Sequence, residues 1–520
     1  MSGETFDYII VGAGSAGCVL AGRLSEDPAV SVLLLEAGGR DNSLYIRMPA
    51  ALSIPLNTRH YNWGFASEPE PGLGGRRMNC PRGRVLGGCS SINGMVYARG
   101  HPLDFEGWAE GGATGWSYPE VLPYFRRAES HARGGDAWRG DGGPLHTSIG
   151  RLDNPLFRAF IEAGVQAGYP RSEDLNGYQQ EGFGPLDMTV KDGVRCSAAM
   201  AYVHPVRSRR NLKIELGVLA LRLTLSGNRA SGVVWVRDGQ RSEALARREV
   251  IVAAGAIGSP QLLMLSGIGP GEELRAHGLE VKVDLPGVGE NLQDHLEIYL
   301  QQACTRPVSL YGRMNPLGKL AIGVRWVLTK EGVGASNQFE AGAFIRSRAG
   351  IRWPDLQYHF LPLAISYDGR TMPRTHGFQA HIGPMLPGSR GRIRLRSTDP
   401  REPPRLLFNY MTEEEDWITF RAAIRLTREI FAQPAFDLYR GAELSPGPAV
   451  QSDAEIDDFI RAHAESAYHP CGTCRMGSDR LAVVDAECRV HGIAALRVVD
   501  AAVMTRITNG NLKAPPILIA

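Results

Sequence analysis

The sequence predicts an α/β protein built around a doubly wound parallel β-sheet, and three observations near the N-terminus support that prediction. The segment Phe6–Val11 is an almost continuous apolar run, typical of a parallel strand buried on both faces. A glycine-rich turn over residues 12–17 follows directly, and a helical pattern of apolar residues continues to Leu24. A second apolar strand, Val30–Leu35, ends at Glu36. Strand, turn, helix and strand in this order predict a βαβ unit.

The turn reads Gly12-Ala13-Gly14-Ser15-Ala16-Gly17, which is the spacing of a dinucleotide-binding loop. Gly12 permits a tight turn, Gly14 lets the backbone approach a pyrophosphate, and Gly17 lets the helix pack closely on the strand. The helix N-terminus offers N–H groups and a positive dipole end to the phosphates. Glu36 can accept hydrogen bonds from ribose hydroxyls and would repel the 2′-phosphate of NADP. The expected nucleotide contacts are Gly12, Gly14, Ser15, Ala16, Gly17, Glu36 and Ala37. The turn alone leaves FAD and NAD open.

Length and composition exclude several classes of protein. The 520 residues are 43% hydrophobic and 22% charged with a net charge of +2, so we expect a globular protein of several domains and no nucleic-acid partner. Eight cysteines are too few for a disulfide scaffold, so reduced thiols and a cytoplasmic location are expected. Neither a signal peptide before Phe6 nor a transmembrane segment is expected. Peripheral contact with the inner membrane stays open.

Two longer segments favour FAD over NAD as the cofactor. Residues 83–95 read Gly-Arg-Val-Leu-Gly-Gly-Cys-Ser-Ser-Ile-Asn-Gly-Met, and residues 255–260 read Gly-Ala-Ile-Gly-Ser-Pro. They resemble the two signatures of the glucose–methanol–choline (GMC) flavin oxidoreductases. Further family landmarks follow in the same order at residues 287–295 and 498–501. The resemblance covers nearly the whole chain and implies an enzyme that uses FAD to oxidise an alcohol.

The resemblance also implies how the flavin is held. In the family the first signature lies along the flavin ring. The implied contacts there are Val85, Gly88, Asn93, Gly94 and Val96. Val218 resembles the adenine-side contact, with plain packing in the core as the alternative, and Asp500 and Ala501 belong to the last landmark. Some relatives attach FAD through a histidine at the position of Ile92, which cannot form that bond. FAD is therefore expected to be non-covalent.

His469 is the leading candidate for a catalytic residue. The segment Ala467–Thr473 resembles the family's active-site histidine motif. A neutral imidazole can take the hydroxyl proton of an alcohol while hydride passes to flavin N5. The family's partner residue is often the second Asn of an Asn-x-Asn run near the C-terminus. That position reads Lys513 here and only Asn511 matches, so both residues are candidates.

Cys471 and Cys474 form a CxxC pair beside the candidate histidine. A zinc ribbon needs a second pair at similar spacing, and a haem site needs a histidine directly after the second cysteine. The sequence contains neither pattern, so we expect packing cysteines and no metal.

Within the family, residues 338–342, 354–362 and 464–470 are most similar to bacterial choline dehydrogenases. Glu340 matches an acidic position that faces the trimethylammonium group in choline-oxidising relatives. A carboxylate with aromatic residues such as Trp63 and Tyr468 suits a quaternary cation, whereas a cationic Lys513 would disfavour it. Choline and another primary alcohol, aliphatic or aromatic, are both open.

The resemblance implies a discontinuous two-domain plan. Residues 1–155, 190–300 and 460–520 are expected to form a Rossmann-like FAD-binding domain. Residues 156–189 and 301–459 are expected to form a substrate domain, an antiparallel sheet flanked by helices, to which the alternating run 376–395 and the helical run 413–431 would belong. Relatives continue beyond Ala520, so a trimmed C-terminus is expected.

Several functional alternatives remain at this point. A dehydrogenase would pass electrons to a quinone or another acceptor, whereas an oxidase would use O₂. The family also contains hydroxynitrile lyases and photodecarboxylases, which catalyse no net oxidation. Lys513 in the partner position leaves a non-catalytic flavin carrier open as well.

Overall fold

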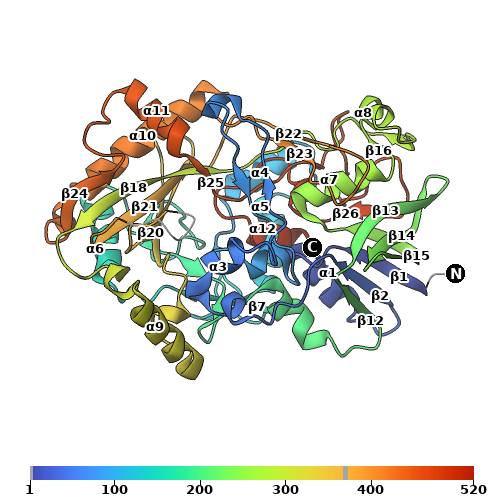
Figure 1. The fold of residues 1–520 in the computed structure, drawn as a ribbon, viewed down its shortest axis with the longest axis horizontal. Helices are drawn as coiled ribbons and strands as arrows, with labels where there is room; N and C mark the ends of the chain where they lie inside the picture. Colours follow the sequence, from blue (N-terminus) through green and yellow to red (C-terminus); the bar gives the residue numbers. More distant parts are fainter. Residues whose placement is uncertain (1–3, 367–372) are drawn as a thin grey trace.

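The computed structural model describes residues 4–366 and 373–520. Two seven-stranded β-sheets lie in opposite halves of the molecule (Figure 1), one largely parallel and one antiparallel. The expected α/β fold class, with a nucleotide-binding sheet and a second, antiparallel sheet flanked by helices, is confirmed.

The first sheet has the strand order β12-β2-β1-β15-β14-β13, and β26 adds to the end of β15. Its parallel strands are β1 (Glu4–Val11), β2 (Val32–Glu36), β12 (Leu212–Leu216), β15 (Gln240–Val252) and β26 (Leu496–Val498). Its antiparallel strands are β13 (Leu219–Ser226) and β14 (Arg229–Arg237).

The βαβ unit expected at the N-terminus is present. Helix α1 (Ser15–Leu24) connects β1 to β2, and Ile10 pairs with Leu34 in a parallel register. Helix α7 (Gly255–Leu265) follows β15, the neighbour of β1, in the same way. Both helices therefore begin at the carboxyl edge of adjacent parallel strands, where α/β proteins bind their ligands.

The second sheet has the strand order β24-β18-β21-β20-β19-β8, and β25 pairs with β18. Its strands are β8 (Gly182–Pro185), β18 (Leu296–Cys304), β19 (Ala341–Ile345), β20 (Leu356–Leu361), β21 (Gly377–Pro384), β24 (Arg440–Ser445) and β25 (Glu465–Ser466). Helices α6 (Pro155–Gln166) and α10 (Glu414–Phe431) pack on it. α10 confirms the predicted helical run. β18 spans residue 300, where the sequence places a domain boundary, and the domain limits stay a prediction.

Aromatic side chains fill the space between the antiparallel sheet and its helices. Phe160 of α6 stacks on Phe360 of β20 with ring centroids 4.6 Å apart, and Phe378 of β21 stacks on Phe436 at 4.9 Å. Such pairs add to the hydrophobic stabilisation of the core. The sheet therefore forms a stiff wall for the cavity described below.

Shorter elements connect the two sheets. The remaining α-helices are α2 (Leu44–Arg47), α3 (Ser53–Leu56), α4 (Pro102–Glu110), α5 (Tyr118–Ala128), α8 (Gly271–Ala276), α9 (Pro316–Thr329), α11 (Asp453–His463) and α12 (Ala514–Ile519). A four-stranded sheet joins β5 (Val96–Tyr97), β9 (Asp187–Met188), β7 (Leu145–Ile149) and β6 (Glu129–His131). Two-stranded ladders pair β3 (Phe65–Ala66) with β4 (Asn79–Cys80), β10 (Val190–Lys191) with β11 (Val194–Arg195), β16 (Ile268–Gly269) with β17 (Val283–Asp284), and β22 (Arg392–Arg394) with β23 (Arg405–Leu407). Among the described residues, no helix has the length and apolarity needed to cross a membrane.

A methyl group on Gly17 tests how closely α1 approaches the first turn. In Gly17→Ala the new Cβ would lie 1.8 Å from the Gly12 carbonyl oxygen, so the helix must shift. We expect the free energy of unfolding to fall by roughly 1–3 kcal/mol, as for other overpacked sites. Chemical denaturation measures it. Gly107→Ala in α4 is the matched control, because its Cβ meets nothing within 4 Å. Equal stability of the two variants would contradict the prediction.

Candidate active site

One cavity of about 630 Å³ reaches from the carboxyl edge of the parallel sheet to the antiparallel sheet. Its lining includes most of the residues singled out in the sequence, which are Gly12, Gly14, Ser15, Ala16, Glu36, Ala37, Trp63, Gly88, Asn93, Gly94, Val96, Val218, Tyr468, His469, Asp500, Ala501, Asn511 and Lys513. Gly17, Val85 and Glu340 are not part of the lining. The cavity thus brings together segments that are far apart in the chain.

The nucleotide end of the cavity is formed by the glycine turn and the end of β2. Gly12 has a φ of +104°, and a Cβ there would lie 2.5 Å from the Ala253 carbonyl oxygen, so only glycine fits without strain. The Glu36 carboxylate accepts hydrogen bonds from the backbone N–H groups of Ala13 at 2.9 Å and Gly38 at 2.7 Å. Burial raises the pKa of Glu36 to about 7, while those N–H groups oppose the shift. Each oxygen keeps a lone pair for a ribose hydroxyl.

Residues 83–96 pass close to the glycine turn and form a second wall. Gly88 has a φ of +53°, and a Cβ there would lie 2.7 Å from the Gly14 Cα. The Asn93 amide oxygen accepts from the buried Arg195 guanidinium at 2.9 Å. Ile92 lines the cavity, while Val85 packs behind it in the same apolar cluster. A planar ring could lie along this wall without meeting side chains from the glycines.

His469 lies at the other end of the cavity, against a second histidine. Its Nδ1 is 3.0 Å from Nδ1 of His295, whose Nε2 is 3.1 Å from the Met385 carbonyl oxygen. A carbonyl only accepts, so His295 carries its proton on Nε2 and accepts at Nδ1. His469 must then carry its proton on Nδ1. This hydrogen-bond pattern leaves Nε2 of His469 unprotonated, so its lone pair can accept a hydrogen bond or a proton.

Asn511, not Lys513, lies against this nitrogen. The Asn511 amide nitrogen is 3.3 Å from Nε2 of His469. Its amide oxygen accepts from the Gln357 amide at 3.0 Å and is 3.1 Å from Nε2 of His359. These two contacts fix the orientation of the amide, so its N–H group points at His469.

Lys513 lines the cavity, but its ammonium group is bound elsewhere. It donates to the Thr189 hydroxyl at 2.5 Å and to the Cys196 carbonyl oxygen at 2.9 Å. Burial lowers the pKa of Lys513 to about 7. The Lys513 ammonium group, which the sequence suggested would disfavour a cationic substrate, is therefore held by other partners. It also loses its charge more easily than an exposed lysine does.

Buried Asp294 anchors the histidine segment to the chain before β18. One carboxylate oxygen accepts from the His469 backbone N–H at 2.6 Å. The other accepts from the hydroxyls of Ser466 at 2.5 Å and Tyr410 at 2.6 Å. Burial raises the pKa of Asp294, which the hydroxyl groups counteract. This carboxylate fixes the backbone on both sides of the two-histidine contact.

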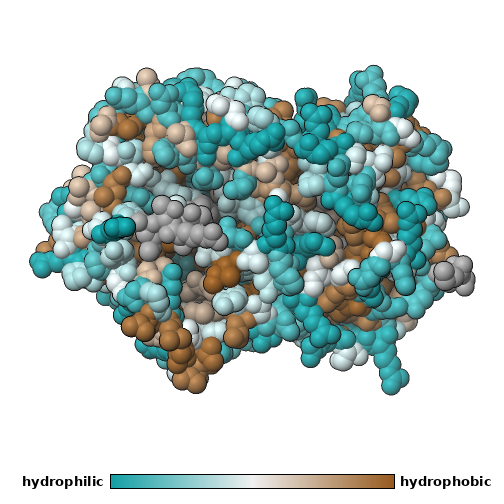
Figure 2. Space-filling model, viewed as in Figure 1, coloured by the Kyte–Doolittle hydropathy of each residue, from teal (hydrophilic) through white to brown (hydrophobic). Residues whose placement is uncertain are grey.

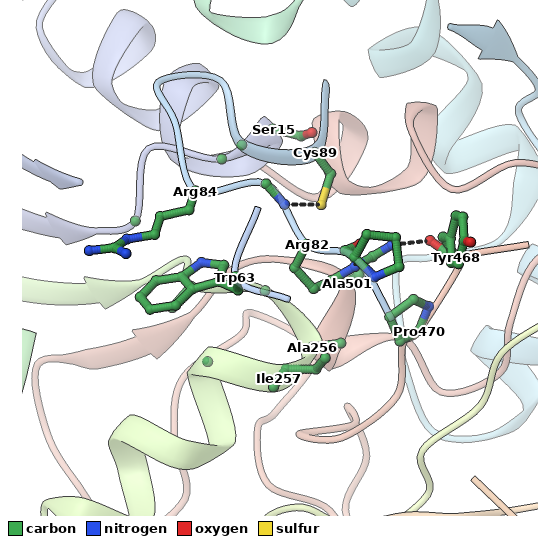
Figure 3. Close-up of a pocket in the computed structure, with 18 of the residues that line it drawn as sticks. Ser15, Trp63, Arg82, Arg84, Cys89, Ala256, Ile257, Tyr468, Pro470 and Ala501 are labelled. Atoms are coloured by element: carbon green, nitrogen blue, oxygen red, sulfur yellow. Dashed lines mark hydrogen bonds between the residues drawn. The ribbon is translucent and has the colours of Figure 1, made fainter. Parts of the chain in front are cut away.

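The predicted substrate residues do not form one cluster. The Glu340 carboxylate is bound to the Leu152 backbone N–H at 2.7 Å and to the Ser336 hydroxyl at 2.5 Å, outside the cavity lining. Trp63 stacks on Phe65 and lies under the guanidinium of Arg84. Figure 3 shows Trp63 beside Arg84 and well away from Tyr468. Trp63 and Tyr468 therefore do not face each other across one binding site.

Glu297 is the carboxylate that does line the cavity near the histidines. It is buried at the start of β18, and its Oε1 is 3.2 Å from Nδ1 of His381. The sequence analysis assigned no role to Asp294, His295, Glu297 or His359. The signal was present, since the landmark at 287–295 contains Asp294 and His295 and the segment 354–362 contains His359.

The CxxC cysteines are buried in the main apolar cluster and form no disulfide. Burial raises the pKa of both thiols, so they stay protonated at neutral pH. Among the described residues, no three His, Cys, Asp or Glu side chains are grouped as metal ligands.

The parallel sheet carries a dinucleotide-binding turn, and one cavity joins it to an antiparallel sheet with a histidine that can act as a base. This is the architecture of a dinucleotide-dependent oxidoreductase. The family model described as GMC oxidoreductase matches residues 6–297 in its N-terminal part and 387–520 in its C-terminal part. The chain belongs to the GMC oxidoreductase family. It is an FAD-dependent enzyme acting on CH–OH donors.

Known relatives are similar over the full chain. An oxygen-dependent choline dehydrogenase of Brucella anthropi is 56% identical over 515 residues, which cover 99% of this chain and 94% of the relative. That of Paraburkholderia phymatum is 57% identical, covering 100% and 92%. Among solved structures, pyridoxine 4-oxidase from Mesorbium loti has a TM-score of 0.90 at 35% identity, covering 99% and 97%. Formate oxidase from Aspergillus oryzae has a TM-score of 0.94 at 26% identity, covering 100% and 97%.

The enclosed histidines predict a loss of stability in acid. Burial and the charge of His359 lower the pKa of His295 to about 4. Burial and the charge of His295 hold the pKa of His469 well below its usual range. Below pH 6.5 these two imidazoles bind protons in the unfolded chain but stay neutral in the folded chain. The free energy of unfolding therefore falls as the pH falls. Between pH 7.5 and 5.5 His295 alone should contribute a loss of roughly 1 kcal/mol.

Urea unfolding of the wild type and of His295→Asn at the two pH values tests this. The variant should lose roughly 1 kcal/mol less than the wild type. His60→Asn is the control, because it makes the same substitution at an exposed histidine. The same pH dependence in His295→Asn and wild type would rule out the assignment.

Proposed function

We propose that the protein oxidises a primary alcohol to the aldehyde with His469 as the base, and that choline is the first candidate substrate. The hydrogen bonds that leave a lone pair on Nε2 of His469 are the main support for this assignment. The choline dehydrogenase names of the similar full-length proteins support the substrate.

FAD would be held by the residues around the nucleotide end of the cavity. Gly12 and Gly14 leave room for the pyrophosphate, Glu36 would bind the ribose, and the wall at Gly88 and Asn93 would face the ring. The same proposal includes Ser15, Ala16, Ala37, Gly94, Val96, Val218, Asp500 and Ala501 as contacts, with Gly17 and Val85 acting from behind the wall. Ile92 supports non-covalent attachment, because its side chain has no nucleophile. Bound FAD supplies the acceptor for the hydride of the alcohol carbon.

The protein residues would control the hydroxyl proton. Nε2 of His469 takes the proton as charge develops on the alcohol oxygen. Desolvation keeps the imidazole neutral and ready to accept. The second N–H of the Asn511 amide can hydrogen-bond the same oxygen and orient the carbon. His359 holds that amide in place through its contact with the Asn511 amide oxygen. His295 acts as a positioning residue that holds the proton of His469 on Nδ1.

Glu297 takes the role that the sequence analysis gave to Glu340. A quaternary ammonium group cannot donate a hydrogen bond, so a buried carboxylate and aromatic faces are what recognise it. Glu297, Phe339 and Tyr468 all line the cavity. Lys513 is held by Thr189 and Cys196, so its position does not oppose a cation at Glu297.

The electron acceptor is a quinone, another oxidised compound or O₂. The similar choline dehydrogenases carry "oxygen-dependent" in their names, which supports O₂ as one acceptor. The unprotonated Nε2 of His469 favours alcohol oxidation over a non-catalytic flavin carrier. A lyase or photodecarboxylase would leave the flavin oxidised when an alcohol is added in the dark.

Anaerobic mixing with choline and a panel of neutral primary alcohols tests the substrate. We expect choline to bleach the flavin absorbance, and admission of air then reports whether O₂ restores it. Glu297→Gln should raise the KM for choline at least about 10-fold, with a smaller effect on neutral alcohols, because one charged contact is lost. If no alcohol bleaches the flavin, the enzyme is not an alcohol oxidoreductase.

A comparison of three variants tests the assignment of the base. His469→Ala should slow flavin reduction by at least about 10²-fold, as expected for a lost general base. Asn511→Ala should slow it about 10-fold or more through one lost hydrogen bond, while Lys513→Met should change it by less than about 3-fold. Stopped-flow absorbance at saturating alcohol measures all three. If Lys513→Met slowed flavin reduction more than Asn511→Ala, Lys513 and not Asn511 would be the partner of His469.

A further inference from the structure

Arg195, at the end of β11, and Lys513, directly before α12, are two buried cations beside the cavity. Most charged side chains keep their water by lying on the surface, which Figure 2 shows as largely hydrophilic, whereas these two are each 2% exposed. The Arg195 guanidinium donates to the backbone oxygen of Asn93 at 2.7 Å and to its amide oxygen at 2.9 Å. Lys513 is held by the Thr189 hydroxyl and the Cys196 carbonyl oxygen. All of these acceptors are uncharged.

Neither cation forms a salt bridge with an Asp or Glu among residues 4–366 and 373–520. Nη2 of Arg195 also has no hydrogen-bond partner in these ranges. Two other arginines buried to this degree differ, since Arg99 and Arg139 bind the buried Glu129 carboxylate at 2.6 and 2.8 Å. A buried cation without an anion has lost its hydration and gained no ion pair. The two unpaired charges therefore point to an anion that is not a side chain.

Both cations are attached to the wall that would face the flavin ring. Asn93 lines the cavity, and Arg195 binds it from outside the lining. The Thr189 N–H donates to the Met95 carbonyl oxygen at 2.9 Å, which ties the partner of Lys513 to the same stretch of chain. Lys513 itself lines the cavity, and its two partners use two of its three N–H donors. Because the described residues offer the third donor no acceptor, it is available to a group bound in the cavity.

We propose that Lys513, together with Arg195, stabilises the negative charge of reduced FAD and so raises the reduction potential of the bound cofactor. The inference rests on the FAD site of the proposed function. In alcohol oxidation the hydride carries two electrons and one proton from the alcohol carbon to the oxidised ring, and the hydroxyl proton goes to His469. The alcohol leaves as the aldehyde, and one negative charge remains on the ring. A nearby cation therefore attracts the reduced ring more strongly than the uncharged oxidised ring.

The pKa values of the two groups agree with a missing anion. Burial lowers the pKa of Arg195 to about 9 and that of Lys513 to about 7. The charge of Arg195 contributes to the lowered pKa of Lys513, and Cys196 opposes it. A negative charge on the ring would raise the pKa of Lys513 again and restore its full charge.

Anaerobic redox titration of the full chain loaded with FAD, against a reference dye, tests the proposal. At a fixed potential, Lys513→Met should lower the ratio of reduced to oxidised flavin at least about 10-fold, which is a fall of about 30 mV in the midpoint potential. Lys513→Arg keeps the charge and should stay closer to the wild type. Lys513→Gln keeps a donor for the Cys196 carbonyl oxygen, should show the same fall, and replaces Lys513→Met if that variant is unstable. The charge on the ring is complete only after the hydride has arrived, so the midpoint should change more than the rate of flavin reduction.

Lys191→Gln is the matched control, because it removes the charge of an exposed lysine that does not line the active-site cavity. It should keep the wild-type midpoint potential. Release of FAD from the loaded chain, measured by ultrafiltration, is the second readout, and Lys513→Met should loosen reduced FAD more than oxidised FAD. A wild-type midpoint in both Lys513→Met and Lys513→Gln overturns the inference. So does equal loosening of both forms of FAD, since that result assigns the two cations to the pyrophosphate. A wild-type chain that binds no FAD contradicts the proposed function instead.

Discussion

The cavity depends on backbone segments that meet with no side chain between them. Gly17 lies against the Gly12 carbonyl, Gly12 against Ala253, and Gly88 against Gly14. Each contact joins a different part of the chain to the carboxyl edge of the parallel sheet. A methyl group at any of the three glycines would push the walls apart. The shape of the nucleotide end is therefore fixed by the absence of side chains at these three positions.

At the other end of the cavity, directional hydrogen bonds set the chemistry. The Met385 carbonyl determines where His295 carries its proton, and His295 then determines where His469 carries its own. Asp294 holds the backbone of both histidines. A group that touches no substrate thus decides which nitrogen of His469 is basic. Low solvent access strengthens each of these contacts and keeps both rings neutral.

The features that could be predicted from the sequence are those encoded by local residue patterns. The βαβ unit, α10 and the fold class were predictable, because strand and helix periodicities are read over a few residues. The choice between Asn511 and Lys513 was not, since both lie in an irregular segment where spacing does not tell which side chain faces His469. The choice between Glu340 and Glu297 presents the same difficulty, because both carboxylates lie in or beside segments that resemble the family. In the structure, hydrogen bonds to the Ser336 hydroxyl and the Leu152 N–H hold the Glu340 carboxylate outside the cavity.

His295, which contacts the proposed base His469, and Glu297, the proposed contact for the cation, are two residues apart at the start of β18. Two residues of extended chain span about 7 Å. β25 pairs with Leu296 and Glu297 and carries the chain on to His469, so the base and the carboxylate are tied to the same pair of strands. In the proposed arrangement, the length of substrate that fits between the base and the carboxylate follows from the geometry of these paired strands.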